Sequence, residues 1–112
     1  MKTNTKYSGY RLMWMIVMFD LPTVDADDRK KASTFRKFLL NNGFEMSQFS
    51  VYLKFIGLRE NSNKVIKQVK TAVPPGRVSM LFFTDKQFSE IISINNNVVE
   101  RNPEAPEQLL LF

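Results

Sequence analysis

The sequence predicts an α+β fold in which a strand, a helix, two strands, a helix and a strand follow one another. A continuous apolar run at residues 12–19 indicates a strand in the middle of a sheet, with both of its faces covered. Two stretches with apolar residues three and four apart indicate amphipathic helices, and alternation between residues 44 and 55 indicates two further strands. This order is that of the ferredoxin-like, or split βαβ, sandwich.

The first strand stops where Asp20 is followed by Leu21-Pro22. A helix is expected from about Asp28 to Asn42, with Gly43 as the residue that ends it. The apolar positions of this helix are Ala32, Phe35, Phe38 and Leu39. Three carboxylates lie at its start, where they can cap free N–H groups and meet the positive end of the helix dipole. They are Asp25, Asp27 and Asp28, and we interpret them as capping residues rather than as a metal cluster.

The alternation changes phase within "QFSVY", residues 48–52, which predicts a bulge or a tight connection between two strands. A second helix is expected between "ENSN" and "PPG". Its apolar stripe consists of Val65, Ile66, Val69, Ala72 and Val73. A buried strand at 77–83 follows, then a turn or short helix at "TDKQFSE" and a last short strand at "IISIN".

In this arrangement we expect the first and third strands to be central and parallel, with both helices on one face. The ferredoxin-like domain is expected to span 12–96, between an N-terminal extension at 1–11 and a C-terminal tail at 97–112. The tail ends in an apolar tip that cannot easily bury itself locally. We expect this tip to add a strand to a sheet edge or to pack on another subunit. It consists of Leu109, Leu110, Leu111 and Phe112.

The chain of 112 residues contains neither cysteine nor histidine. These absences exclude disulfides, thiolate nucleophiles, the usual zinc sites and histidine acid–base catalysis. Any catalysis must use carboxylates, lysines, hydroxyls or an oxygen-bound metal such as Mg²⁺ or Mn²⁺. No apolar stretch reaches the roughly 18 residues of a membrane span, and the apolar run behind the N-terminus ends in Asp-Leu-Pro rather than small residues. We therefore expect a cytoplasmic protein.

The net charge of +5 is unevenly distributed along the chain. Residues 1–87 carry 15 basic and 7 acidic residues, a net charge of +8, whereas 88–112 carry one base and four acids. A basic body with an acidic end suggests a polyanionic partner, although a well-solvated surface explains the same charges.

Asp20 is the candidate catalytic and metal-binding residue, because it lies at the end of a predicted central strand, where sites gather in open sheets. Mg²⁺ often takes only one or two carboxylates, and a two-fold dimer would supply two copies of Asp20. A metal-bound water could then attack a phosphodiester. The structural alternative is a turn in which the carboxylate bonds backbone N–H groups two residues on.

The first predicted helix carries a row of basic residues on its expected solvent side. They are Arg29, Lys30, Lys31, Arg36 and Lys37. A second basic stripe consists of Lys64, Lys67 and Lys70. Both rows could follow a phosphate backbone, or could simply be solvated helix faces. Arg77 is a candidate phosphate clamp or a plain strand-end charge, and Ser50 could assist at a phosphate or bond backbone. The many Phe and Met residues are expected in the core, not as base-stacking platforms.

Three stretches, "MIVMFDLP", "RKKASTFRKFLLNNGFEMSQFSVY" and "VPPGRVSMLFFTDKQF", resemble the CRISPR-associated Cas-two family, most closely its type II members. These are small core proteins of spacer adaptation, known as endoribonucleases. The resemblance covers about residues 12–95. It implies a ferredoxin-like homodimer with Asp20 as the Mg²⁺-binding aspartate at the dimer cleft. It also implies an integrase subunit as partner, in a complex that inserts short DNA into the CRISPR array.

In such a complex the small protein mainly bridges and measures DNA, and nuclease activity varies among members. The family's C-terminal segment commonly crosses to the partner protomer or contacts the integrase. We therefore interpret the chain as a dimeric scaffold for duplex DNA, with metal-dependent endonuclease activity on RNA or DNA as an additional activity. A regulatory oligomer that binds a small molecule on the same fold is the alternative, and it rests on the fold alone.

Overall fold

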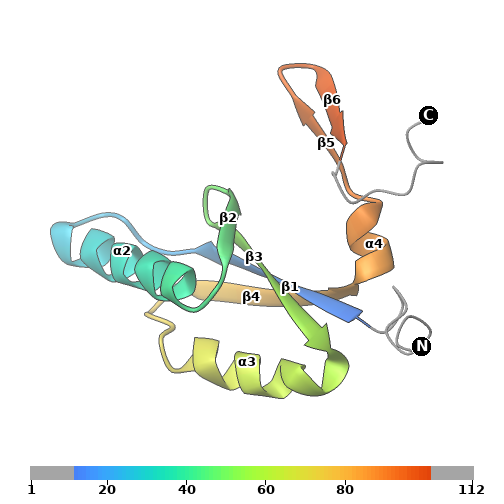
Figure 1. The fold of residues 1–112 in the computed structure, drawn as a ribbon. Helices are drawn as coiled ribbons and strands as arrows, with labels where there is room; N and C mark the ends of the chain where they lie inside the picture. Colours follow the sequence, from blue (N-terminus) through green and yellow to red (C-terminus); the bar gives the residue numbers. More distant parts are fainter. Residues whose placement is uncertain (1–11, 102–112) are drawn as a thin grey trace.

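A four-stranded sheet in the order β2-β3-β1-β4 forms the centre of the structure, a computed structural model that describes residues 12–101 (Figure 1). Its strands are β1 (Leu12–Asp20), β2 (Glu45–Gln48), β3 (Val51–Leu58) and β4 (Arg77–Thr84). The helices α2 (Ala26–Asn41) and α3 (Ser62–Lys70) connect them, and the 3₁₀ turn η1 (Arg59–Asn61) precedes α3. The element order confirms the predicted ferredoxin-like sandwich, with β1 and β3 in the two central places.

The expectation that the first and third strands are parallel is wrong, because β1 pairs antiparallel with both β3 and β4. Ile16 lies opposite Leu53 on one side and Leu81 on the other. The reason is the path of the chain. Helix α2 returns the chain so that β2 runs in the direction of β1, and the turn after β2 reverses it before β3 enters the sheet between them.

Helix α2 begins where the sequence places its carboxylates. Asp25 is the N-cap residue, and its Oδ1 accepts a hydrogen bond of 2.8 Å from the Asp28 backbone N–H. The helix therefore starts two residues before the predicted Asp28, and capping is confirmed as the role of Asp25. At the other end Gly43 has φ +86°, a left-handed conformation that glycine adopts without strain.

The core lies between the sheet and the two helices, which cover the same face. Alternate side chains of β1, from Met13 to Phe19, point into it. Phe35 and Leu39 of α2 and Val65 and Val69 of α3 pack against them. Because all of these residues belong to one buried cluster, the predicted apolar stripes of both helices are confirmed as core-facing.

The opposite face of the sheet, called the outer face below, is left largely uncovered by residues 12–101. It carries the other side chains of β1 together with their partners across β3 and β4. Met18 is 39% exposed, Phe55 47% and Leu81 43%. The expectation that both faces of the first strand are covered is therefore met on the helix face only.

Helix α4 (Asp85–Ser89) follows β4 and packs on one end of the outer face. Thr84 and Gln87 form a capping box at its start. The Trp14 indole Nε1 donates a 2.7 Å hydrogen bond to Asp85 Oδ1, and its ring stacks on Phe88 with centroids 3.8 Å apart. The "TDKQFSE" segment is thus a short helix fastened to β1.

Strands β5 (Ile92–Asn95) and β6 (Val98–Arg101) form a hairpin that extends away from the main sheet (Figure 1). The predicted strand at "IISIN" is confirmed, and its pairing partner β6 lies in the stretch assigned to the tail. The expectations for 1–11 and for Leu109–Phe112 fall outside the described residues. Within residues 12–101, no helix has the length and apolar character needed to cross a membrane.

Candidate metal and nucleic-acid site

Asp20 is the last residue of β1, and its side chain is exposed. It follows Met18 at the spacing of two that keeps side chains on one face of a strand, so it belongs to the outer face. Arg77 lies opposite it in register, but neither residue takes part in the ion pairs found within residues 12–101. The alternative turn bond has no donor two residues on, because Pro22 lacks an N–H. The carboxylate is therefore free to bind a ligand.

A single protomer supplies little more than this carboxylate to a metal ion. Among the described residues, no group of three or more acidic side chains is arranged to hold a metal. Asp25 is engaged in the helix cap, and Asp27 pairs with Lys31 at 3.1 Å. Mg²⁺ accepts one or two carboxylates and completes its shell with water and phosphate oxygens. Asp20 fits such a half-site, and a second copy of the chain or a bound phosphate would have to complete it.

The β2–β3 turn, residues Phe49 and Ser50, lies directly beside this strand end. The Ser50 carbonyl accepts a 3.1 Å hydrogen bond from the backbone N–H of Phe19, the residue before Asp20. Ser50 has φ +66°, a conformation that a residue with a side chain rarely adopts. This strained turn is the tight connection that the phase change predicts, and a bulge between Met46 and Gln48 accompanies it. The fold thus brings the backbones of Asp20 and Ser50 to one end of the sheet, with the Asp20 side chain on the outer face and the Ser50 hydroxyl bonded to Arg36 of α2.

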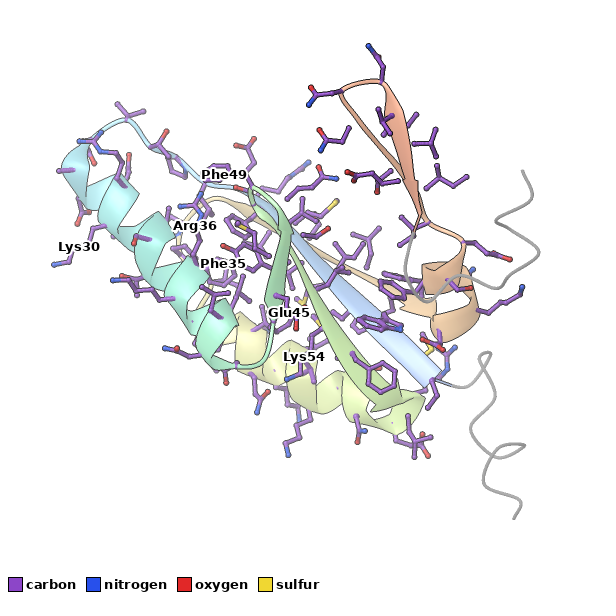
Figure 2. The ribbon with its side chains drawn as sticks, turned by 45° about the horizontal axis from the view of Figure 1, so that its top comes forward. Lys30, Phe35, Arg36, Glu45, Phe49 and Lys54 are labelled. Atoms are coloured by element: carbon purple, nitrogen blue, oxygen red, sulfur yellow. The ribbon has the colours of Figure 1, made fainter. Side chains whose placement is uncertain are left out.

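Arg36 reaches from α2 to the same turn, so its predicted place in the solvent-facing row is wrong. Its guanidinium carbon lies 5.5 Å from the ring centroid of Phe19 and 4.4 Å from that of Phe49. Its Nη2 donates to Ser50 Oγ at 3.4 Å, while its buried Nε has no partner within the described chain. Figure 2 shows Arg36 on the side of α2 that faces Phe49. Packing between two aromatic rings half-buries this residue and directs it toward the turn.

Phe49 is the aromatic residue that contradicts the expectation that every Phe lies in the core. Its side chain is 76% exposed, although the alternation placed it in phase with Val51 and Leu53. The turn begins at this residue, and the strand periodicity therefore stops applying to it. The phase change at Phe49-Ser50 is the sequence feature that could have predicted this exposure. If these two residues form a turn rather than a bulge, Phe49 is the first turn residue and points to solvent.

The remaining predicted basic residues differ in whether their side chains make hydrogen bonds or ion pairs. Arg29 is tied to the backbone carbonyls of Thr23 and Val24, at 3.2 and 3.3 Å from Nη1, and Lys31 is paired with Asp27. Lys30 and Lys37 are exposed and make no hydrogen bond or ion pair within residues 12–101. Figure 2 shows Lys30 pointing away from the body of the molecule. On α3 three exposed cations form the second stripe, namely Lys64, Lys67 and Lys70.

Comparisons with known proteins agree on one family. Residues 13–91 match the family model described as "CRISPR associated protein Cas2". The chain is 46% identical over 106 residues to a CRISPR-associated endoribonuclease Cas2 from Paracidovorax avenae, covering 94% of this chain and 98% of that protein. It is 38% identical over 109 residues to the protein of the same name from Flavobacterium psychrophilum, covering 96% and 95%. It is 44% identical over 84 residues to that from Streptococcus mutans serotype c, covering 74% and 77%.

Proposed function

Because the chain belongs to the Cas2 family of CRISPR-associated proteins, we propose that it acts in spacer acquisition as a dimeric scaffold that binds duplex DNA and bridges integrase subunits. The observation that carries the proposal is the position of Asp20. Within residues 12–101 it is a carboxylate without an ion-pair partner, on an outer face that these residues leave largely uncovered. A metal site and a covered sheet would both be completed by the same second copy.

The outer face supports a two-fold dimer. It is apolar around Met18, Phe55 and Leu81, and contiguous apolar surface of this kind is characteristic of interaction sites. Two copies packed through this face with the axis near the end of β1 would place two Asp20 carboxylates in one cleft. Such an isologous contact uses the same patch on both subunits, as most homodimers do.

The endonuclease activity is the second part of the proposal. Asp20 and its symmetry mate would hold Mg²⁺, which supplies an activated water and neutralises charge on a phosphodiester. Ser50 Oγ already accepts a hydrogen bond from Arg36, so its own proton remains available to a phosphate oxygen. Arg77, which is exposed and lies opposite Asp20 in register, would contact the same phosphodiester backbone.

Duplex DNA would lie against the basic helices. Lys30 and Lys37 on α2 and the three lysines on α3 are exposed cations, and each contacted phosphate releases a counterion on binding. The apolar tail tip, Leu109 to Phe112, is proposed to contact the integrase or the partner protomer. The alternative of a small-molecule regulatory oligomer has no support beyond the fold, and the family match argues against it.

Replacing Asp20 tests the metal site. Asp20→Asn removes the charge that holds Mg²⁺ but keeps the size of the side chain, so we expect at least a 100-fold loss of Mg²⁺-dependent cleavage with unchanged folding and dimerisation. The measurement is cleavage of labelled RNA and DNA at graded Mg²⁺ concentrations. Asp27→Asn, which removes another exposed carboxylate in an ion pair, is the matched control and keeps full activity. Cleavage by a clean Asp20→Asn preparation would remove Asp20 from the metal site.

Reversing charge on α2 tests the scaffold role. The double variant Lys30→Glu, Lys37→Glu loses two phosphate contacts, so the log–log salt slope of duplex binding flattens by about 2. Affinity is measured by titrating labelled duplex at several salt concentrations. Lys86→Glu, on α4, removes a lysine that is paired with Glu90 at 3.1 Å and serves as the control. An unchanged slope in the double variant would discard α2 as the duplex surface, and the α3 stripe would be tested next.

A further inference from the structure

We propose that Phe49 and Arg36 form a binding site for an unpaired nucleotide, whose base stacks on the Phe49 ring while its phosphate is attracted by the Arg36 charge. This site rests on the proposed role in nucleic-acid binding and names the form of nucleic acid that this edge of the sheet selects. The ligand class is a single-stranded segment or a frayed duplex end of either RNA or DNA.

The Phe49 ring has the properties of a stacking platform. It is 76% exposed at the tip of the β2–β3 turn, where no other described side chain except Arg36 forms a ring or cation contact with it. The guanidinium lies 4.4 Å from the ring centroid and so occupies one side of the ring. An exposed apolar ring is unfavourable in water, and a stacked base would cover it. Every base has a π-face, so such a platform tolerates different sequences.

Arg36 supplies the second observation, because it is a partly buried cation without an acidic partner in the described chain. Its contacts there are two aromatic rings and the neutral Ser50 hydroxyl, and its Nε is buried without an acceptor. The described residues therefore leave the guanidinium without a negative counter-charge. A phosphate beside the turn would provide it, and Arg favours phosphate geometrically.

The packing also holds the platform in place before a ligand arrives. The ring of Phe19, buried in the core, supports the Arg36 guanidinium at 5.5 Å from its centroid. Arg36 in turn lies against Phe49, as the labelled side chains in Figure 2 show. The turn itself is fixed by the bond from Phe19 N–H to the Ser50 carbonyl. A preorganised ring loses little conformational freedom on binding. The same backbone bond places the platform at the end of β1 that carries Asp20, on the helix side of the sheet, whereas the Asp20 side chain points to the outer face.

Bases inside a duplex stack on each other and are not available to Phe49. The experiment therefore compares a single-stranded oligonucleotide carrying one 2-aminopurine with a blunt duplex of the same sequence, in DNA and in RNA, using the full chain. Transfer of the 2-aminopurine from its neighbouring bases to the Phe49 ring changes its emission. We expect Phe49→Leu to weaken single-strand binding roughly five- to 100-fold and to abolish this change, with duplex affinity within two-fold of the original. Phe49→Tyr, which keeps an aromatic ring, restores both signals.

Three further results complete the test. Val24→Ala trims another strongly exposed apolar side chain and leaves single-strand binding unchanged. Unchanged single-strand affinity in Phe49→Leu overturns the site, while a flattened duplex salt slope in Lys30→Glu, Lys37→Glu would leave the proposed scaffold role intact. A Phe49→Leu variant that no longer sediments as a dimer, and that loses single-strand and duplex binding equally, would show that a second copy covers Phe49 and would also overturn the site.

Discussion

Lys54 supplies a hydrogen-bond donor where α2 leaves its last carbonyl groups unsatisfied. Its Nζ donates to the Asn42 carbonyl at 2.6 Å and lies 5.7 Å from the Phe44 ring centroid. The positive charge at the helix C-terminus also interacts favourably with the negative end of the helix dipole. A Cβ on Gly43 would lie 2.8 Å from the same Nζ, so a side chain there would push the lysine aside, and the positive φ of +86° favours glycine independently.

Lys54→Met tests this contact. Methionine keeps the length of the chain but leaves the Asn42 carbonyl without its donor, so we expect the free energy of unfolding to fall by about 1–2 kcal/mol. Urea denaturation followed by circular dichroism measures the change. Lys70→Met, at an exposed position on α3, is expected to change stability by less than about 0.5 kcal/mol. Equal effects of the two substitutions would contradict the capping role.

For single residues, the sequence predicted the roles that depend on residues nearby in the chain. Asp25 begins α2 and Gly43 follows its last turn. Both roles depend on residues close by in the sequence, so the local pattern predicts them. Arg36 could not be placed, because its burial depends on Phe19 and Phe49, which come from two other segments. Asp20 was predictable as a strand end, whereas its freedom from partners required the structure.

The β5–β6 hairpin has a turn whose residues, Asn96 and Asn97, suit its backbone conformation. Asn96 and Asn97 have φ of +53° and +66°, as a two-residue type I′ connection requires, and Asn tolerates this region better than most residues. Ile94 and Val99 face each other across it. The side chains of residues 92–95 and 98–100 are exposed, which leaves little burial to stabilise a hairpin that is already marginal by itself.

Asn97→Val tests the turn. A β-branched residue at φ +66° is strained by about 1–2 kcal/mol, so the hairpin should open more often. Hydrogen exchange resolved by residue should show roughly five- to 30-fold faster exchange in β5 and β6, with β1 unchanged. Asn97→Gly fits the same backbone without strain and should slow exchange slightly. A Val variant that exchanges like the parent would exclude the type I′ turn.

Long, periodic elements were predictable from the sequence, and their pairing was harder. The apolar run of β1 and the stripes of α2 and α3 appear where the pattern places them. The direction of β3 against β1 does not follow from periodicity, since an alternating strand looks the same in either direction. The chain reverses direction on entering α2, on leaving it and again at the short β2–β3 turn. Because the last reversal is needed to make β3 antiparallel to β1, the direction depends on that turn.

At the scale of the whole molecule, the uneven covering of the sheet is the main feature. One face is buried beneath two helices, and the other exposes apolar side chains over β1, β3 and β4. A protein of this size buries only part of its apolar surface by itself, and association is the usual remedy. The proposed dimer and the proposed metal site both depend on this face.

Leu81→Lys tests the dimer. Leu81 is 43% exposed on the outer face, so a lysine there is tolerated by the folded protomer but would be desolvated against a second copy. We expect sedimentation to shift from dimer to monomer, with the helical circular dichroism unchanged. Leu40→Lys places the same charge at an exposed position on α2 and should leave the dimer intact. A dimeric Leu81→Lys protein would place the interface elsewhere.

The fastening of α4 to β1 has a practical consequence. Trp14 is the single tryptophan of the chain, and it touches Phe55, Phe88 and the Asp85 carboxylate at the root of the segment that leads to the hairpin. Its ultraviolet emission therefore comes from one known place. Any ligand or protein that moves α4 away from the sheet would change the polarity around that indole. The emission of Trp14 would then change, and the movement could be measured without an attached dye.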